Sequence, residues 1–341
     1  MVNGSGLRLL FLGGTGVISA AAVERAAGLG HRVTVLNRGA SYLRPVPDGV
    51  EVLHADVRDE AALGATLGNR EFDAVADFLS FTPEHAAAAV SRFAGRTGQY
   101  VFISSASAYQ KPPARLPILE STPLRNPFWR YSRDKIGCED LLVDAYRTDG
   151  FPVTIVRPSH TYDRTSMPLL GGWTDIHRLR SGLPVLVHGD GTSLWTLTHS
   201  SDFAFAFTGL LGRPQSVGES YTITSDEFLP WDQVYRLLAA AAGVPEPELV
   251  HVSSATIAAY APSLGPGLLG DKAHSVIFSN AKIKSLVPGY RADIPFSTGA
   301  REIIGWHDAH PGTQTVDPDF MAVSDELVAW ARGAPGSASG S

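Results

Sequence analysis

A phenol and an ammonium stand four residues apart in the segment Tyr131-Ser132-Arg133-Asp134-Lys135. Residues four positions apart in a helix lie on the same face, so Tyr131 and Lys135 can act on one reacting group. An ammonium close to a phenol stabilises the phenolate, and we therefore expect Lys135 to lower the pKa of Tyr131 from its usual value of about 10. The pair would then exchange a proton with a substrate hydroxyl near neutral pH.

A glycine-rich turn follows an apolar run in the segment Leu9-Leu10-Phe11-Leu12-Gly13-Gly14-Thr15-Gly16. This is typical of a strand that turns into a helix, where free backbone N–H groups and the helix dipole hold a pyrophosphate. Taken alone, such a turn is more often structural, and so is a lone Tyr-x-x-x-Lys pattern. A third segment favours the functional interpretation: the β-rich residues 99–103 lead into Ser104 and Ser105, at a strand end where open α/β sheets bind ligands. Together the three segments indicate a nicotinamide-dependent redox enzyme.

Apolar runs alternate with alanine-rich stretches, which predicts an α/β fold with a Rossmann-type doubly wound parallel sheet. The expected strands are Arg8–Leu12, Arg32–Leu36, Val50–His54, Ala74–Phe78, Tyr100–Ile103 and Pro152–Val156. The expected helices are Ala20–Leu29, Glu60–Leu67, Pro83–Ala94 and Tyr131–Asp149. Beyond these elements proline and glycine become more frequent, and we expect a smaller C-terminal substrate-binding lobe there.

These elements suggest a division of the chain. We assign residues 1–162, with returning segments near 185–212, to an NAD(P)-binding Rossmann domain and residues 163–332 mainly to the substrate-binding lobe. Residues 333–341 are rich in Gly, Ser, Ala and Pro, and we expect a disordered tail without a chemical role.

Composition excludes several classes of partner. The net charge of −6 provides no basic surface for nucleic acid, and no apolar run approaches the roughly 20 residues that span a bilayer. The single cysteine, Cys138, rules out an internal disulfide, and the eleven histidines lack the spacing of a metal site. We therefore expect a cytoplasmic protein without a bound metal that acts on a small molecule.

The three segments resemble the extended short-chain dehydrogenase/reductase superfamily, in particular its NAD(P)-dependent sugar epimerase and dehydratase type. The resemblance extends over residues 7 to about 205, and the supporting matches are Glu120 with Pro123, Arg157-Pro158, and Gly189-Asp190-Gly191 followed by His199 and Asp202. It implies a catalytic set of Ser105, Tyr131 and Lys135. Ser105 is chosen over Ser104 because of its position relative to the following aromatic residue, Tyr109. The resemblance also implies a homodimer whose interface includes the Tyr131 helix.

The resemblance further implies where the dinucleotide binds. The expected contacts are Gly13, Thr15, Gly16, Val17, Ile18, Asn37, Arg38, Asp56, Val57, Phe78 and Lys135. Ser19 replaces the third glycine of the family's pattern and is small enough to keep the helix close to the strand. Asn37-Arg38 stands where an acidic residue would bind the ribose of NAD, and because an arginine can pair with a 2′-phosphate we favour NADP over NAD. Alternatively, Arg38 stacks on the adenine, which fits either cofactor.

The absence of a carboxylate after Ser105 bears on the type of reaction. Related dehydratases and decarboxylases carry a carboxylate just after the catalytic hydroxyl, whereas this chain has Ala106-Ser107 there, so we do not expect elimination or decarboxylation. The remaining chemistry is reversible oxidation of a secondary alcohol of a sugar, nucleoside or nucleotide-sugar, and we favour a sugar epimerase. The alternatives are a single-step ketoreductase or dehydrogenase with exchanging NADP(H), or a cofactor-binding protein without catalysis.

The substrate residues expected from the resemblance are Ser107, Tyr109, His160 and Trp195. His160 stands where relatives usually have an asparagine that contacts substrate, although a buried structural histidine is an equal alternative. Trp195 stands where nucleotide-sugar enzymes carry a diphosphate-binding arginine, and an indole offers a flat apolar platform instead. Either the substrate has no diphosphate, or Trp195 packs in the core while another arginine binds phosphate, such as Arg164, Arg178 or Arg301.

Overall fold

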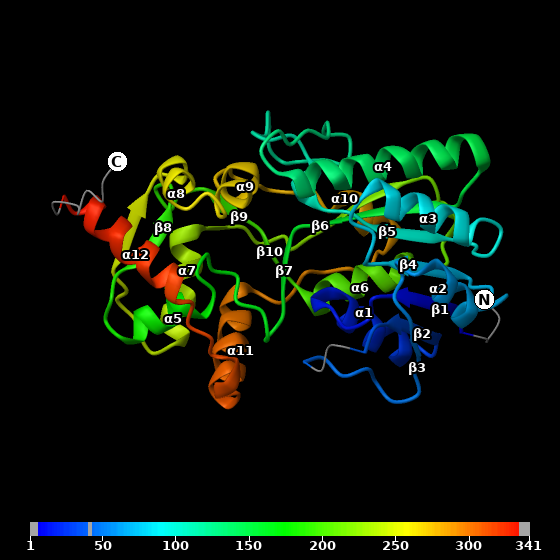
Figure 1. Cartoon of the computed structure of the whole chain (residues 1–341), viewed down its shortest axis with the longest axis horizontal. Coiled ribbons are helices and arrows are strands. Elements are labelled where there is room, and N and C mark those ends of the chain that lie inside the picture. The colour runs from blue at the N-terminus through cyan, green and yellow to red at the C-terminus, as the bar shows by residue number, and fades with distance from the viewer. Residues whose placement is uncertain (1–5, 40–42, 334–341) are drawn as a thin grey trace.

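The computed structural model describes residues 6–39 and 43–333, and its centre is a seven-stranded sheet (Figure 1). Along the sheet the strands follow the order β11-β6-β5-β4-β1-β2-β3, and every neighbouring pair runs parallel. Their bounds are β1 (Arg8–Leu12), β2 (Arg32–Asn37), β3 (Glu51–His54), β4 (Ala74–Asp77), β5 (Tyr100–Ile103), β6 (Val153–Pro158) and β11 (Ser220–Ile223). The strand order reverses between β1 and β4, which is where such sheets bind ligands at their carboxyl ends.

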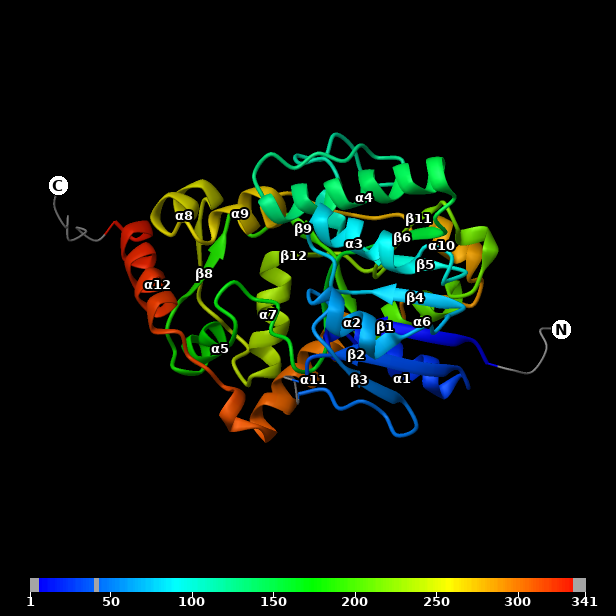
Figure 2. The same cartoon turned by 45° about the vertical axis from the view of Figure 1, so that its right-hand side comes forward.

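Helices cover both faces of this sheet, each over an apolar layer. One layer joins the sheet to α1 (Val17–Gly28), α6 (Ser200–Leu210) and α10 (Ala281–Leu286). The other joins it to α2 (Glu60–Leu67), α3 (Pro83–Phe93) and α4 (Arg130–Asp149). Figure 2 shows α3 and α4 side by side over the strands, and the two helices pack against each other. The inner strands are buried on both faces, as in other parallel sheets, whereas the edge strand β3 is largely exposed.

The doubly wound α/β fold is confirmed, and the six expected strands and four expected helices all form. The largest shift is in α1, which begins at Val17, three residues before the expected start. Gly16 is its N-cap, and the Gly16 N–H donates to Ser19 Oγ at 2.8 Å, so the serine stabilises the first turn. The seventh strand, β11, was not predicted; it pairs with β6.

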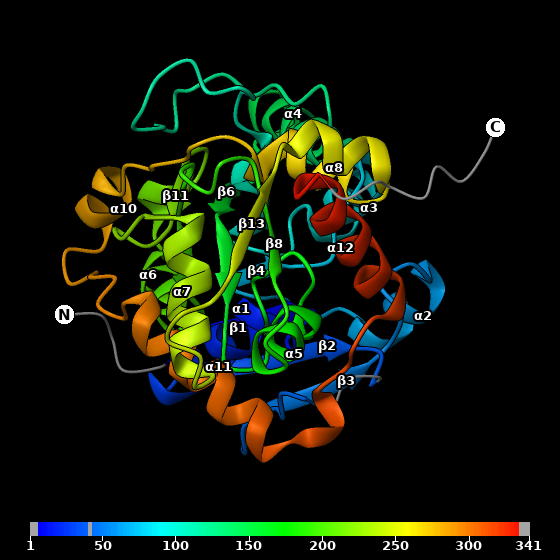
Figure 3. The same cartoon turned by 90° about the vertical axis from the view of Figure 1, so that its left-hand side faces the viewer.

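The rest of the chain forms a lobe at the other end of the molecule, with an apolar core of its own (Figure 3). It holds three two-stranded ladders, β7 (His160–Tyr162) with β10 (Leu197–His199), β8 (Val185–His188) with β13 (Leu249–Val252), and β9 (Leu194–Trp195) with β12 (Leu229–Pro230). Its helices are α5 (Trp173–Arg180), α7 (Trp231–Ala241), α8 (Ser254–Tyr260), α9 (Gly265–Gly267), α11 (Phe296–Ala309) and α12 (Pro318–Ala331). Four short elements are the 3₁₀ turns η1 (Ala106–Ala108), η2 (Pro214–Ser216) and η4 (Pro311–Thr313) and the π-helix η3 (Leu268–Lys272).

The segment near residues 185–212, which we expected to return to the sheet, begins in the lobe and ends with α6 on the sheet. Residues 185–188 form β8, which pairs with β13 inside the lobe. The return begins with α6 at Ser200 and ends with β11. Except for Gly333, the expected tail lies outside the described residues. Within the described ranges no helix is long and apolar enough to cross a membrane.

Candidate active site

The carboxyl end of β5 and the first turns of α4 meet beside a cavity of about 290 Å³. Ser105 and Tyr131 both line this cavity, and Lys135 lies one helical turn after Tyr131. Asn126 fixes this geometry: its Oδ1 accepts the backbone N–H groups of Phe128 and Trp129, and its Nδ2 donates to the carbonyl of Ser107 at 2.9 Å. The start of α4 is thereby tied to the loop that follows β5.

Lys135 is buried and joins the end of β5 to the turn that follows β4. Its ammonium donates to the carbonyl of Ser80 at 2.6 Å and to that of Ile103 at 2.7 Å. Burial lowers the pKa of Lys135 from 10.5 to about 8. The two carbonyl contacts fix the position of the ammonium, whose Nζ lies 6.0 Å from the centre of the Tyr131 ring.

Tyr131 differs in one respect from the expectation drawn from sequence. Burial raises its pKa, whereas we expected Lys135 to lower it; the Ser105 hydroxyl acts in the lowering direction. The physical reason is that the ring is enclosed by other aromatic rings, with Trp129 at 5.0 Å and Phe81 at 6.5 Å between centroids. In this structure Ser105 is therefore the group that favours the phenolate of Tyr131.

Three hydroxyls form a hydrogen-bonded chain next to the phenol. Ser105 Oγ lies 2.8 Å from Ser107 Oγ, and the hydroxyl of Ser132 donates to Ser107 Oγ at 2.8 Å. Ser107 lines the cavity, as its expected role requires, although its side chain is buried. The chain orients the Ser105 hydroxyl toward the cavity that Tyr131 also faces.

Tyr109 does not line the cavity, contrary to its expected role in substrate binding. It is fully buried, its phenol lies 2.6 Å from Thr222 Oγ1, and Arg157 donates to the same oxygen at 3.1 Å. Arg157 also pairs with Glu139 of α4, with Nη2 and Oε2 2.5 Å apart. Tyr109 therefore belongs to a buried polar group behind the site, which joins β6, β11 and α4.

His160 and Trp195 line the cavity together, as expected of substrate residues. The indole N–H of Trp195 donates to Nδ1 of His160 at 3.0 Å, and the Trp195 ring lies 5.2 Å from that of Trp231. Burial lowers the pKa of His160 to about 3, and the charge of Lys272 acts in the same direction. His160 is therefore neutral at physiological pH, and Trp195 both packs in the lobe core and walls the cavity.

None of the three arginines considered for phosphate binding lines this cavity. Arg178 is buried in the lobe, where it pairs with Asp325 at 2.7 Å and donates to the carbonyl of Pro184. Arg164 and Arg301 line a different hollow, of about 840 Å³, between α1 and the lobe. The basic residue in the cavity wall is Lys272, which lies next to Asp271. No motif in the sequence singles out these two residues, because the fold of the lobe brings them to the site.

A second cavity, of about 250 Å³, opens at the switch point of the sheet. It is lined by six of the expected cofactor contacts, Gly13, Thr15, Asn37, Arg38, Asp56 and Val57. Gly13 has φ +84°, which only glycine adopts readily, and a Cβ on Gly13 would lie 2.8 Å from the Leu79 side chain. The glycine turn thus leaves room beside the N-terminus of α1, and these residues fit a dinucleotide whose pyrophosphate lies at that helix end.

Phe78, an expected cofactor contact, does not line this pocket. Its ring packs at 6.1 Å from Phe11 and at 5.6 Å from Phe207, within the apolar layer between β1 and α6. Arg38 does line the pocket, where its Nη1 lies 4.0 Å from Asp56 Oδ2 and its side chain is mostly exposed. A second arginine, Arg58, lines the pocket as well.

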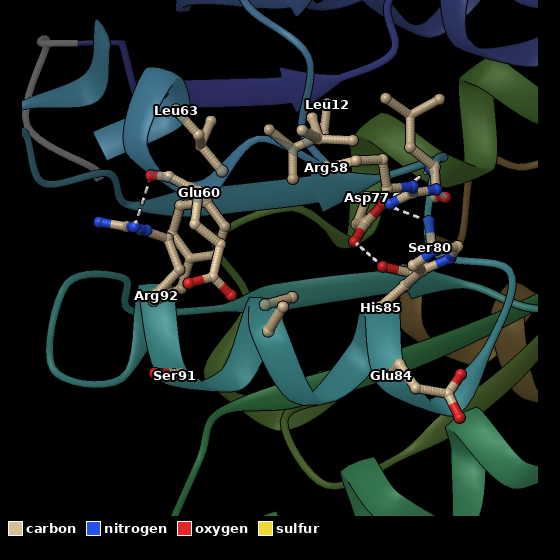
Figure 4. Close-up of a pocket in the computed structure, with 15 residues that line it drawn as sticks. Leu12, Arg58, Glu60, Leu63, Asp77, Ser80, Glu84, His85, Ser91 and Arg92 are labelled. Atoms are coloured by element: carbon tan, nitrogen blue, oxygen red, sulfur yellow. Dashed lines mark hydrogen bonds between the residues drawn. The ribbon is translucent and has the colours of Figure 1, made fainter. Parts of the chain in front are cut away.

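A further hollow, of about 470 Å³, lies between α2 and α3 on the far side of Arg58 (Figure 4). Asp77 accepts the hydroxyl of Ser80 at 2.6 Å on one side of it, and Arg92 donates to the carbonyl of Glu60 on the other. These four residues therefore already form hydrogen bonds with one another in pairs. Asp77 also accepts the Ser80 N–H at 2.9 Å and so fixes the turn whose carbonyl holds Lys135.

Comparison with known proteins agrees with this geometry. The model of the NAD dependent epimerase/dehydratase family matches residues 9–224, which is more than half of the chain. The chain therefore belongs to the NAD-dependent epimerase/dehydratase family, within the extended short-chain dehydrogenase/reductase superfamily.

Individual relatives differ in what they do. The chain is 28% identical to the chloroplast stem-loop binding protein of 41 kDa b of Arabidopsis thaliana, over 72% of this chain and 65% of that protein. It is 27% identical to the 2'-dehydrokanamycin reductase of Streptomyces kanamyceticus, over 70% of this chain and 68% of that enzyme. Among solved structures, the epimerase Mth375 of Methanothermobacter thermautotrophicus superposes with a TM-score of 0.75 at 16% identity, over 91% of this chain and 94% of that one.

Proposed function

We propose that the protein is a sugar epimerase that oxidises and re-reduces one secondary alcohol with a retained nicotinamide dinucleotide. The observation that carries this proposal is that Ser105 and Tyr131 face one cavity, with the Lys135 ammonium 6.0 Å from the centre of the Tyr131 ring and a second pocket at the switch point of the sheet. Membership of the family supports the same class of chemistry.

Each residue has a distinct role in the proposed reaction. Tyr131 takes the proton from the substrate hydroxyl and later returns it, while Ser105 holds the same oxygen through its hydroxyl. Lys135, fixed by two carbonyls, places a positive charge behind the phenol. The bound nicotinamide nucleotide supplies the acceptor and donor of the hydride. An epimerase needs the oxidised substrate to turn over in the cavity so that its other face is presented.

Elimination chemistry is disfavoured by the groups in the cavity. No carboxylate follows Ser105, because η1 consists of Ala106, Ser107 and Ala108. Asp271 is the acidic side chain in the cavity wall, and it is paired with the buried ammonium of Lys111 at 2.8 Å. A carboxylate held in this way is a poor proton shuttle, which supports simple redox chemistry at a secondary alcohol.

A single-step reductase that exchanges NADP(H) is the second candidate. The relative from Streptomyces kanamyceticus is named as a reductase, and it is similar to most of this chain. The same three residues serve a reductase, with Tyr131 donating its proton to the developing alkoxide. The raised pKa of Tyr131 suits proton donation.

We further propose NADP rather than NAD as the preferred nucleotide, within a family described as NAD dependent. Arg38 and Arg58 both line the pocket at the end of β2, and the exposed guanidinium of Arg38 is 4.0 Å from its acidic neighbour Asp56. Two guanidinium groups near the ribose favour a 2′-phosphate.

An enzyme is preferred to a nucleic-acid-binding protein, although the Arabidopsis relative is named for stem-loop binding. The chain has 34 acidic and 28 basic residues, so it lacks the excess of positive charge that phosphate backbones attract. We retain the expected homodimer as a prediction, with the Tyr131 helix, α4, of each subunit in the interface.

Analysis of bound nucleotide tests the proposed function. Freshly purified, undialysed protein is denatured, and the released nucleotides are identified by chromatography and mass. We expect close to one nucleotide per chain, mainly NADP, from both the wild type and Tyr131→Phe, since the substitution leaves the pocket at the switch point intact. An empty protein that binds added NADPH would support the reductase, and a protein that binds neither nucleotide would contradict both candidates.

A further inference from the structure

Lys272 lies at the junction of two chambers. The candidate substrate cavity adjoins a larger outer chamber of about 770 Å³, and both are lined by Trp129, Tyr131, His160 and Lys272. The wall of the outer chamber also holds apolar residues, such as Met167, Leu169 and Leu268, and two arginines. Arg130 lies 3.5 Å from the carboxylate of Asp134, and Arg133 donates to the carbonyls of Asn126 and Pro127. A ligand that occupies both chambers therefore lies against both Tyr131 and Lys272.

The backbone of Lys272 is held in place from three directions. It is the last residue of the π-helix η3, a rare helix type that is often found at functional sites. Its carbonyl accepts Trp231 Nε1 at 3.3 Å, His188 Nε2 at 3.2 Å and Ser193 Oγ at 3.4 Å. Asn126 ties the same helix to the start of α4 by donating to the carbonyl of Gly270 at 2.7 Å. The position of Lys272 relative to Tyr131 is thus fixed by the fold.

The ammonium of Lys272 has no salt bridge or hydrogen bond within residues 6–39 and 43–333. The neighbouring carboxylate, Asp271, is already paired with Lys111, whose side chain is fully buried. Lys272 Nζ lies 4.0 Å from the position that a Cβ on Gly267 would occupy, at the wall of the outer chamber. The three charges Lys111, Asp271 and Lys272 therefore leave one positive charge uncompensated at the junction.

Without an anionic partner, the charged form of the Lys272 side chain is unfavourable in free energy in these surroundings. Burial lowers the pKa of Lys272, Asp271 acts in the opposite direction, and Lys111 lowers the pKa further. A buried ammonium is stabilised mainly by an anionic partner. His160, which lines both chambers together with Lys272, is neutral near pH 7 and supplies no anion.

We propose that Lys272 determines substrate specificity by pairing with a single anionic oxygen group of the substrate, a phosphate monoester or a carboxylate, at the junction of the two chambers. An ammonium is a point charge that matches one such group, whereas a diphosphate is better matched by planar guanidinium forks. The inference rests on the proposed function in that it takes the cavity beside Tyr131 to be the substrate site. It adds that the substrate is an anionic sugar derivative.

Binding of three small probes tests this assignment without turnover. The protein with its nucleotide bound is titrated with glucose 1-phosphate, with glucuronate and with glucose, and dissociation constants are measured by calorimetry. We expect at least one anionic probe to bind about 10 to 100 times more tightly than glucose, as hydrogen bonds to charged groups do. The stronger of the two anions identifies whether the group is a phosphate or a carboxylate.

Three variants assign the preference to one side chain. Lys272→Met should remove the preference for the anion, Lys272→Arg should retain most of it, and Lys282→Gln should leave it unchanged. Lys282 is a fair control because it pairs with Glu219 on the surface, away from both chambers. Thermal unfolding checks that each variant folds. A preference that survives in a folded Lys272→Met protein overturns the inference, as does equal or absent binding of the three probes to the wild type.

These measurements separate the inference from the proposed function. If the anion preference is absent while Tyr131→Phe still abolishes turnover, the role of Lys272 is wrong and the hydride-transfer chemistry stands. If the preference depends on Lys272 while Tyr131→Phe retains full activity, the binding site is correct and the proposed chemistry is wrong.

Discussion

Two lysines from different parts of the molecule lie near Tyr131, and they differ in burial and in how their charge is satisfied: Lys135 is buried, whereas Lys272 is partly exposed. Lys135, from the sheet side, donates to the carbonyl of Ser80 in the turn after β4 and to that of Ile103 at the end of β5. Lys272, from the lobe, has its backbone fixed by three donors while its ammonium has no partner among the described residues. An ammonium that is already hydrogen-bonded to the protein is held in one position. An ammonium without a partner in the protein is instead suited to pair with a ligand.

The same contrast applies to the two parts that carry these lysines. The sheet is covered on both faces by helices that pack on continuous apolar layers, so its strand ends are held rigidly. The lobe is built from three two-stranded ladders around a core rich in aromatic rings. Short ladders allow the lobe to bring residues distant in sequence, such as Trp195 and Lys272, into one wall. Under the proposed function, the sheet would position the reacting groups and the lobe would position the substrate.

Removal of the Tyr131 phenol, on the sheet side of the cavity, should have the largest effect on activity. Tyr131→Phe should lower kcat by about 10² to 10⁴, because the general acid and base is lost. The matched control is Tyr109→Phe, which also removes a phenol close to β5 but lies outside the cavity. The control should lose about 1 kcal/mol of stability and little activity. Equal loss of activity in both variants would show that Tyr131 has only a structural role.

Two ion pairs, one behind the sheet and one on the lobe, should differ in their energetic contributions. Arg157→Met leaves the buried carboxylate of Glu139 without its partner, and the free energy of unfolding should fall by about 3 to 5 kcal/mol. Arg180→Met removes an exposed pair with Asp308, and the loss should be below about 1 kcal/mol. Urea unfolding of both variants measures the difference. Similar losses would mean that the sheet is not the more rigidly held part.

The lobe contributes a pH dependence of stability through His160. Its pKa is about 6.5 when unfolded and about 3 in the folded protein, mainly because of burial and also because of Lys272. Below pH 6.5 the unfolded chain takes up a proton that the folded one does not, so stability is complete above pH 6.5 and falls as the pH drops toward 3. The expected loss from this group is about 1 to 2 kcal/mol by pH 5.

His160→Gln should flatten this part of the pH dependence. A glutamine retains an acceptor for the Trp195 N–H but does not titrate. Unfolding in urea between pH 7 and pH 4.5 provides the measurement. If the variant shows the wild-type slope, other groups of the lobe account for the acid sensitivity.

The smallest expected effect concerns the choice of nucleotide. Arg38→Ala should weaken binding of NADP about tenfold and leave binding of NAD unchanged, since only NADP carries the 2′-phosphate that the arginine would pair with. Arg32→Ala, at the opposite end of β2, should alter neither affinity. Fluorescence titration with the reduced nucleotides distinguishes the outcomes. An equal effect on both would favour stacking of Arg38 on the adenine.

Six strands of the sheet, and the residues that follow them, could be predicted from the sequence alone. Each βα unit is local, so a short apolar run, a turn and an amphipathic stretch are visible within about 30 residues. Glycine at position 13 and the Tyr131–Lys135 spacing also act locally, which is why the pockets at the strand ends contain most of the residues expected there. The strand β11 escaped prediction because its role depends on pairing with the distant β6.

Which other side chains line the cavity beside Tyr131 could not be predicted from the sequence and depends on the tertiary structure. Tyr109 is close in sequence to Ser105, but the pairing of β6 with β11 encloses its phenol between Thr222 and Arg157. Lys272 lies far along the chain, and the lobe brings it to the cavity through contacts from three separate elements. The pKa of Tyr131 likewise depends on how completely other rings surround it. Burial and long-range pairing are properties of the packed chain, and no short sequence pattern encodes them.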